Sequence, residues 1–176
     1  NTYTLNFSYG SGIAVGGAGF LLNNEMDDFS AKEGSQNGYG LVGGTANAIQ
    51  AFKRPLSSMT PTIVFDEKGA PMLATGTPGG STIITIVLQM IVNMVDYDMG
   101  VAEATAAPRI HHQWLPDIVY FEEGISSDTL NILRQKGHLT NFKPSIIGAT
   151  QSISRERGRS SGASDPRRHG AAVALE

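Results

Sequence analysis

The longest apolar run of the chain, residues 83–95, constrains the fold more than any other segment. Its residues are hydrophobic except for Thr85, Gln89 and Asn93. A membrane-spanning helix needs about 20 predominantly apolar residues, so this run is too short to cross a bilayer. A surface helix would show a broad polar face, which the run lacks. The pattern therefore predicts a buried core helix that is apolar on nearly all sides.

The order of the other expected elements indicates an α+β protein. Strand-like alternation covers residues 2–8 and 13–22, and the turn residues 67–69 predict a β-hairpin over 62–66 and 72–75. Helices are expected over 101–107 and from Ser127 to Gly137, where Asp128 and Gly137 are start and stop signals. Strands are expected at 109–112, 118–121, 138–142 and 151–154. Strands followed by helices and again by strands favour α+β layers over regular βαβ alternation.

Glycine is concentrated in the first half of the chain, where it is expected at tight turns with positive φ. Residues 31–44 are poor in aliphatic side chains and rich in Gly, Ser, Asn and Gln. They predict a long surface loop, and loops of this length often act as lids or binding loops. Tyr39 is the only aromatic residue in this loop.

Composition excludes several classes of function. The 176 residues are 40% hydrophobic and carry a net charge of -3, which fits one folded domain and argues against disorder. There is no basic excess to neutralise a phosphate backbone, so nucleic acid is not an expected partner. The chain has no cysteine, which excludes disulfides, thiolate metal sites and a cysteine nucleophile.

A glycine pair, Gly79-Gly80, lies between the predicted hairpin and the apolar helix, in the segment Pro78 to Ser81. Two consecutive glycines let backbone N–H groups turn outward, and the following helix N-terminus adds a positive dipole end. Such a turn can stabilise the oxyanion of an acyl-transfer transition state. The alternative is a tight turn that uses glycine only for its shape.

Two polar clusters are further candidates. Residues 23–29 hold acidic side chains and two asparagines, which could bind an ammonium group or a metal, or could cap a short helix. The ligand spacing of a calcium loop is missing from this segment. Ser57 and Ser58 lie in a polar turn, 54–61, that leads into a strand; their hydroxyl groups can bind a carboxylate or simply form the turn.

The dipeptide His111-His112 resembles a metal or acid–base site at first sight. Successive residues of a strand point to opposite faces, so the two imidazoles are not expected to share a ligand. The pair is therefore interpreted as structural, and no metal site is expected.

Together these segments resemble the small, C-terminal catalytic subunit of the γ-glutamyltranspeptidases, members of the N-terminal nucleophile hydrolase superfamily. The match covers nearly the whole chain and consists of long sequence segments that occur in a fixed order. The matching segments are residues 2–6, 21–30, 39–44, 54–61, 76–81, 107–114 and 162–167.

This resemblance implies a precursor that cleaves itself before a threonine. The new N-terminal threonine is the nucleophile, its α-amino group is the base, and a γ-glutamyl group from glutathione or a related donor is passed to water or to an amino acid or peptide acceptor. The implied fold is a four-layer αββα sandwich completed by a large subunit from the same precursor. No cofactor is expected, and a periplasmic or secreted location is implied by the family.

The resemblance also implies roles for single residues. Thr4 matches the threonine that hydrogen-bonds the nucleophile, and Asn6, Glu25 and Asp28 match the group that holds the substrate's α-amino end. Ser57 and Ser58 match the pair that binds the substrate's α-carboxylate, together with an arginine supplied by the large subunit. Gly79 and Gly80 match the oxyanion-hole glycines, and Tyr39 matches the tip of a lid over the glutamyl pocket.

The sequence departs from the family pattern at its start. The nucleophilic threonine belongs upstream of Thr4 and is not among these residues, and Thr2 and Thr4 do not replace it. Residues 1–174 are accordingly interpreted as the small-subunit domain without its nucleophile strand, and Leu175 and Glu176 as residues of an expression tag. A cephalosporin or glutaryl acylase of the same superfamily and a non-catalytic fragment are the alternatives.

Overall fold

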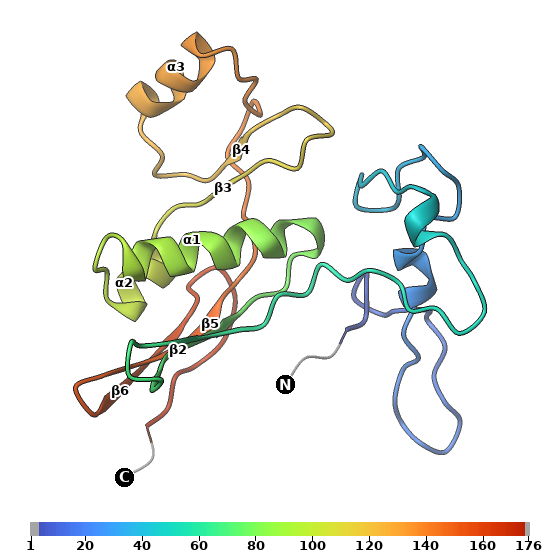
Figure 1. The fold of residues 1–176 in the computed structure, drawn as a ribbon, viewed down its shortest axis with the longest axis horizontal. Helices are drawn as coiled ribbons and strands as arrows, with labels where there is room; N and C mark the ends of the chain where they lie inside the picture. The colour runs from blue at the N-terminus through green and yellow to red at the C-terminus, as the bar shows by residue number, and fades with distance from the viewer. Residues whose placement is uncertain (1–3, 175–176) are drawn as a thin grey trace. The chain divides into compact units, whose positions relative to one another are not determined.

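The computed structural model describes residues 4–174, which divide into two compact units between Ser58 and Met59. The first unit contains two short 3₁₀ helices, η1 (Glu25–Asp28) and η2 (Thr45–Asn47), and is otherwise built of turns and extended segments. The second unit contains the regular elements (Figure 1). They are β1 (Thr62–Phe65), β2 (Pro71–Gly76), η3 (Gly80–Thr82), α1 (Ile83–Val95), α2 (Val101–Ala106), β3 (Ile110–His111), β4 (Tyr120–Phe121), α3 (Ser127–Gln135), β5 (Gln151–Glu156) and β6 (Arg159–Ser164).

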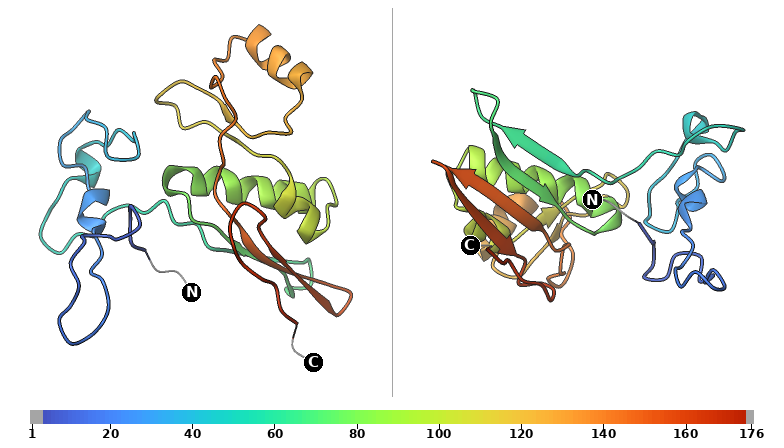
Figure 2. Two further views of the ribbon diagram at one scale, coloured as in Figure 1. Left: turned by 180° about the vertical axis from the view of Figure 1, so that it is seen from behind. Right: turned by 90° about the horizontal axis from the view of Figure 1, so that it is seen from below.

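An antiparallel four-stranded sheet, in the order β1-β2-β5-β6, forms the base of the second unit. Helices α1 and α2 cover one face of this sheet, so the unit has one helix layer and one sheet layer (Figure 2). The core between the layers consists of Leu73 from β2, Met90 and Met94 from α1, and Val101 and Ala104 from α2. Strands with helices in separate layers make this an α+β fold, as the sequence predicts.

The alternation of side chains along the strands gives the sheet a buried face and an open face. On the face beneath the helices, the hydroxyl groups of Thr75 and Ser152 are hydrogen-bonded at 2.8 Å. On the other face Ile63, Ala74 and Ile153 form one cross-strand row, and Phe65 continues the apolar surface. Ile63, Phe65 and Ile153 are 59%, 57% and 60% exposed in this chain. The sheet therefore presents an apolar face that no described residue of the second unit covers.

A smaller layer carries the short antiparallel pair β3–β4 and helix α3. The pair is fixed to α1 through Gln89, which donates to the carbonyl of Ile110 at 2.8 Å and accepts from its N–H at 3.0 Å. Helix α3 begins after Ser126, whose hydroxyl accepts a hydrogen bond from the N–H of Thr129 at 3.1 Å. It is followed by Gly137 at φ 93°, so the start and stop signals of the sequence are confirmed.

Most predicted elements of the second unit are confirmed: the hairpin, the three helices, and the strands at 110–111, 120–121 and 151–156. The long loop 31–44 is also confirmed, since its only ladder contact is an isolated bridge between Gln36 and Val42. The core helix is less enclosed than expected. Ile84 and Leu88 of α1 lie on an exposed side, because only one face of this helix meets the sheet.

Three expectations about strands are wrong. Residues 4–8 and 13–22 form turns, with one isolated bridge between Ala14 and Leu21. Phe7 and Ser8 interrupt the first segment, and Gly17 and Gly19 the second, because all four have positive φ. Residues 138–142 make only a bridge between Thr140 and Val119. Strand β6 was not expected, because its sequence lacks apolar alternation; pairing with β5 across a turn at Arg157 and Gly158 forms it. Thr2 lies outside the described residues.

Candidate functional site

The acidic turn of the first unit is built around η1. Two asparagine side chains hold it: Asn23 Oδ1 accepts from the N–H of Glu25 at 3.1 Å, and Asn24 Oδ1 accepts from the N–H of Asn6 at 3.0 Å. The asparagines therefore satisfy the backbone, which leaves the carboxylates of Glu25 and Asp28 for another role. The second contact also fixes Asn6 beside the turn.

Glu25 is in an unusual electrostatic position. Its Oε1 atom is buried and has no hydrogen-bond donor within residues 4–174. Burial, followed by the adjacent Asp28 carboxyl group, raises the pKa of Glu25 to about 7. Two close carboxyl groups, one with a buried oxygen that the described residues leave unsatisfied, suit a cationic donor.

Tyr39, from the predicted lid, lies close to the same turn. Its ring stacks on Phe7, with ring centroids 5.0 Å apart and planes inclined by 13°. Burial, and then the negative charges of Asp28, Glu25 and Asp27, raise the pKa of Tyr39. The structure thus brings Asn6, Glu25, Asp28 and Tyr39 together within the first unit. Phe7 was not singled out in the sequence, although it directly follows Asn6.

The two serines are joined to the acidic turn through the segment that precedes them. The N–H of Leu56, next to Ser57, donates to Asn47 Oδ1 at 3.0 Å, and Asn47 Nδ2 donates to the carbonyl of Asp28 at 2.7 Å. Ser57 is exposed, whereas Ser58 and Thr4 are half-buried. Asn47 carries no chemical signal that the sequence analysis could detect, because its role lies in contacts across the fold.

The glycine pair belongs to the second unit and lies between β2, which ends at Gly76, and α1; Gly80 is the first residue of η3. Gly79 has φ 150° and Gly80 has φ 56°, both in the region that favours glycine. A Cβ atom on Gly79 would collide with Thr82 Oγ1. The carbonyl of Gly79 accepts from the N–H and the hydroxyl of Thr82, at 3.0 Å and 2.8 Å.

The N–H groups of this glycine pair remain available. Within residues 4–174 neither the Gly79 N–H nor the Gly80 N–H donates to a protein acceptor. The turn is held by Thr77, whose Oγ1 donates to the carbonyl of Pro78 at 2.7 Å and accepts from the N–H of Ala149 at 3.0 Å. A fixed turn with two unpaired N–H groups can stabilise a developing oxyanion.

A buried network of ionised side chains supports the segment that contacts this turn. Asp165 accepts from the N–H of Thr150 and from Arg109 Nη2, each at 2.7 Å. Arg167 bridges Asp165 and Glu122, whose carboxylate also accepts from the N–H of Arg109 at 2.9 Å. Burial alone would raise the pKa of Asp165, but hydrogen bonds from Arg167, Arg109 and Thr150 lower it. Arg109, Asp165 and Arg167 lie in the segments that match the family, but only the fold shows that these three side chains are in contact.

The two histidines have separate partners. His111 is buried, and its ring nitrogens lie 2.8 Å from Thr85 Oγ1 and 2.9 Å from Gln113 Oε1. His112 is paired with Asp117 at 2.9 Å and is partly exposed. In the described part of the chain no three His, Cys, Asp or Glu side chains gather as metal ligands would.

The fold, together with the solved structures that it resembles, defines the class of protein: the C-terminal subunits of N-terminal nucleophile hydrolases. A family model described as Gamma-glutamyltranspeptidase matches residues 1–175, and the chain belongs to this family. The glutathione hydrolase proenzyme of Escherichia coli is 59% identical over 167 residues, a match that covers 94% of this chain and 28% of that protein. The chain thus spans less than a third of the length of this curated relative.

Solved structures of the family match over most of the chain. The γ-glutamyltranspeptidase of Pseudomonas nitroreducens is 43% identical, covers 100% of this chain and 92% of the solved chain, and gives a TM-score of 0.91. A mutant of the Helicobacter pylori enzyme is 51% identical, with 96% and 92% covered and a TM-score of 0.89. Within residues 4–174 no helix has the length and apolar content that crossing a membrane requires.

Proposed function

We propose that the whole protein is a γ-glutamyl amide hydrolase and transpeptidase acting on glutathione and related γ-glutamyl compounds. The observation that carries this proposal is the acidic turn, where Glu25 Oε1 is buried beside Asp28 and finds no donor in the described part of the chain. The α-ammonium group of a γ-glutamyl substrate would supply the missing donor and charge. Membership of the γ-glutamyltranspeptidase family, whose relatives include glutathione hydrolase proenzymes, supports the same substrate.

The other substrate groups are assigned by family resemblance and by chemistry. Asn6, Glu25 and Asp28 bind the α-ammonium group, and the hydroxyls of Ser57 and Ser58 bind the α-carboxylate together with an arginine of the large subunit. Tyr39 closes the pocket as the tip of the 31–44 loop. Its stacking on Phe7 supports a lid that is fixed at the acidic turn.

The reaction follows from these assignments. A threonine hydroxyl, supplied by the part of the protein before Thr4, attacks the γ-carbonyl and gives its proton to the threonine α-amino group. Thr4 orients this nucleophile, and the N–H groups of Gly79 and Gly80 stabilise the tetrahedral oxyanion. Expulsion of the amine leaves a γ-glutamyl ester on threonine, and water or an acceptor amine then cleaves the ester.

The large subunit is proposed to come from the same self-cleaving precursor. The open apolar face of the β1-β2-β5-β6 sheet, with Ile63, Phe65 and Ile153, supports this partner. Burying such a face removes apolar surface from water, which stabilises the complex by about 25 cal/mol for each Å² buried. A second sheet and helix layer on this face would complete the four-layer αββα sandwich. A periplasmic or secreted location is proposed from the family.

The competing enzyme function is a cephalosporin or glutaryl acylase, whose acyl group has no α-amino group. A pocket for an acyl group without an ammonium would gain nothing from two half-buried carboxyl groups, so Glu25 and Asp28 favour the γ-glutamyl substrate. Hydrolysis of γ-glutamyl and glutaryl anilides by the full-length, processed precursor separates the two. We expect preference for the γ-glutamyl anilide. Preference for the glutaryl anilide would indicate an acylase, and no turnover of either would indicate a non-catalytic protein.

A further inference from the structure

We propose that Asn47 is a positioning residue that sets the spacing between the two halves of the substrate clamp. The clamp consists of the ammonium half, Glu25 and Asp28, and the carboxylate half, Ser57 and Ser58. This inference rests on the function proposed above. It adds a determinant of specificity that does not itself touch the substrate.

A single side-chain amide joins the two halves. Asn47 Nδ2 donates to the backbone carbonyl of Asp28 at 2.7 Å, and Asn47 Oδ1 accepts from the N–H of Leu56 at 3.0 Å. Asp28 belongs to the ammonium half, and Leu56 directly precedes Ser57. Both partners are backbone groups, so Asn47 fixes the course of the chain on each side of the clamp.

The amide of Asn47 can have only one orientation, because a backbone carbonyl only accepts and a backbone N–H only donates. The backbone of Asn47 is held as well. Its carbonyl accepts from the N–H of Ser30 and its N–H donates to the carbonyl of Gly44, at 3.0 Å and 3.1 Å. The side chain therefore projects from a fixed base.

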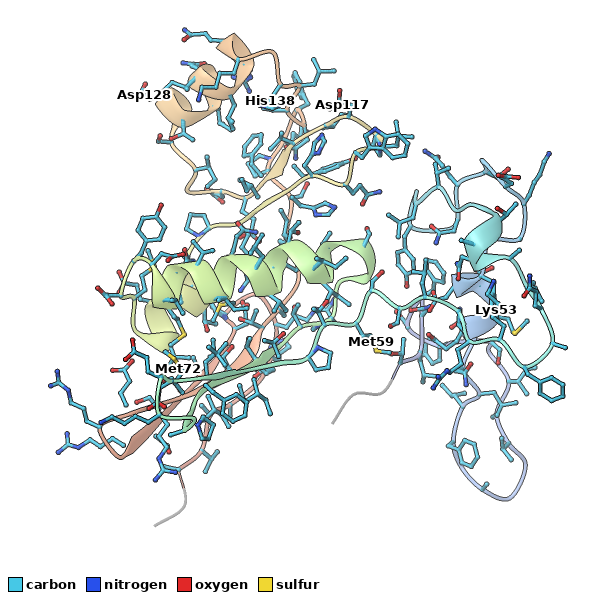
Figure 3. The ribbon with its side chains drawn as sticks, in the orientation of Figure 1. Lys53, Met59, Met72, Asp117, Asp128 and His138 are labelled. Atoms are coloured by element: carbon cyan, nitrogen blue, oxygen red, sulfur yellow. The ribbon has the colours of Figure 1, made fainter. Side chains whose placement is uncertain are left out.

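Lys53 reinforces this base. Its Nζ donates to the carbonyls of Ala46 and Ala48 at 2.7 Å and 3.0 Å, on either side of Asn47. Figure 3 labels Lys53 beside the short helical turns of the first unit. Lys53 thus stabilises the turn from which Asn47 reaches both halves of the clamp.

An α-amino acid group has a fixed, short distance between its ammonium and its carboxylate. A site that binds both groups at once must match that distance, whereas a substrate with only one of them can shift to suit one half. A link that makes Asp28 and Ser57 move together therefore favours γ-glutamyl substrates over those that lack either group. Asn47 provides this link.

The test uses the full-length precursor and three anilides. The γ-glutamyl anilide carries both groups, the glutaryl anilide lacks the ammonium, and the 4-aminobutyryl anilide lacks the carboxylate. Each ordinary hydrogen bond contributes about three- to tenfold to an equilibrium constant. We expect Asn47→Ala to lower kcat/KM for the γ-glutamyl anilide by roughly tenfold, mainly through KM, and to affect the other two by about threefold or less.

Asn141 provides a matched control in the second unit. Its Oδ1 accepts from the N–H of Phe121 at 3.1 Å, and its Nδ2 donates to the carbonyl of Lys143, so it makes the same kind of backbone bridge. Asn141→Ala should change all three anilides by the same factor. If Asn47→Ala does not fold, as judged by thermal melting, Lys53→Met offers a second test. It removes the two hydrogen bonds that Lys53 Nζ donates to the supporting turn, and it should lower γ-glutamyl selectivity in the same direction, but less.

The outcomes separate the two levels of the argument. Equal losses on all three anilides in Asn47→Ala would overturn the positioning role, and so would unchanged selectivity in Lys53→Met when Asn47→Ala is unfolded. A wild-type enzyme without γ-glutamyl preference would overturn the proposed function, and the inference with it.

Discussion

The guanidinium of Arg109 lies 2.7 Å from the carboxylate of Asp165, and the two side chains are only 3% and 0% exposed. Arg109 also donates to the carbonyls of Thr105 and Ile147, at 3.0 Å and 2.9 Å. This one side chain therefore joins the end of α2 to the segment that enters β5. Because Ala149 in that segment holds Thr77, the network indirectly supports the glycine turn.

Replacing Asp165 with asparagine should destabilise the folded protein strongly. The substitution leaves the buried guanidinium of Arg109 without its countercharge, and breaking such a pair typically costs about 3–5 kcal/mol. We expect a clear fall in the melting temperature of the processed protein, measured by differential scanning calorimetry.

Asp117→Asn is the matched control, because Asp117 pairs with His112 at 2.9 Å but its side chain is 81% exposed. Exposed pairs are screened by water and contribute little. Similar melting temperatures for the two variants would show that the Arg109–Asp165 pair is not a major source of stability.

Much of the second unit could be predicted because its signals are local. The apolar run 83–95, the hairpin turn 67–69 and the terminal Gly137 each determine their element through nearby residues. Strand β6 could not be predicted, because Arg159–Ser164 has no strand pattern of its own and becomes a strand by pairing with β5. The opposite error occurs at residues 13–22. Their alternation predicts a strand, but Gly17 and Gly19 at positive φ interrupt it.

The candidate site could be predicted where residues with distinctive chemistry lie close together in the sequence. Glu25, Asp28, Gly79 and Gly80 carry carboxylates or unusual backbone freedom, and such features are visible in a sequence. Asn47 and Asp165 act through contacts with residues distant in the chain, so only the fold reveals them.

Asp28→Asn should weaken γ-glutamyl substrates far more than glutaryl analogues. The substitution removes a charge from the proposed ammonium site, and a hydrogen bond to a charged group contributes about 1.5–3 kcal/mol. We therefore expect kcat/KM for a γ-glutamyl anilide to fall by roughly ten- to a hundredfold. Equal losses on the glutaryl anilide would instead assign Asp28 a structural role.

The affinity for γ-glutamyl substrates should increase as the pH rises toward neutrality. The pKa of Glu25 is raised to about 7 by burial and by Asp28, so Glu25 is largely protonated in acid and ionised above neutrality. An ammonium group binds the ionised form, so KM should fall between about pH 6 and about pH 7.5. The glutaryl anilide should lack this trend, and Glu25→Gln should abolish it.

The same raised pKa makes a prediction for stability. The folded protein holds the Glu25 proton more tightly than the unfolded chain, whose pKa is 4.5. The stabilisation is complete below that value and is lost as the pH rises through about 7. The melting temperature of Glu25→Gln, relative to wild type, should therefore rise between about pH 5 and about pH 8. A constant difference across this range would contradict the raised pKa.

Gly80→Ala should collapse kcat while leaving KM nearly unchanged. The N–H groups of Gly79 and Gly80 have no acceptor within residues 4–174, which fits donors that act on the transition state. Alanine keeps the N–H, but its Cβ at φ 56° would rotate the peptide or fill the site, so the N–H would no longer face the oxyanion. Losing one oxyanion-hole donor typically lowers kcat by about 10²–10³. Steady-state kinetics of the processed enzyme with a γ-glutamyl anilide measure the effect.

A loss of stability must be separated from this loss of catalysis. Gly80 has φ 56°, and an alanine in that conformation costs roughly 1–2 kcal/mol. Gly69→Ala is the control, because Gly69 has φ 78° at the tip of the β1–β2 hairpin and open space around its Cα. The melting temperature should fall by a similar amount in the two variants, but kcat per folded enzyme should fall only in Gly80→Ala. A normal kcat in Gly80→Ala would mean that the turn uses glycine only for its shape.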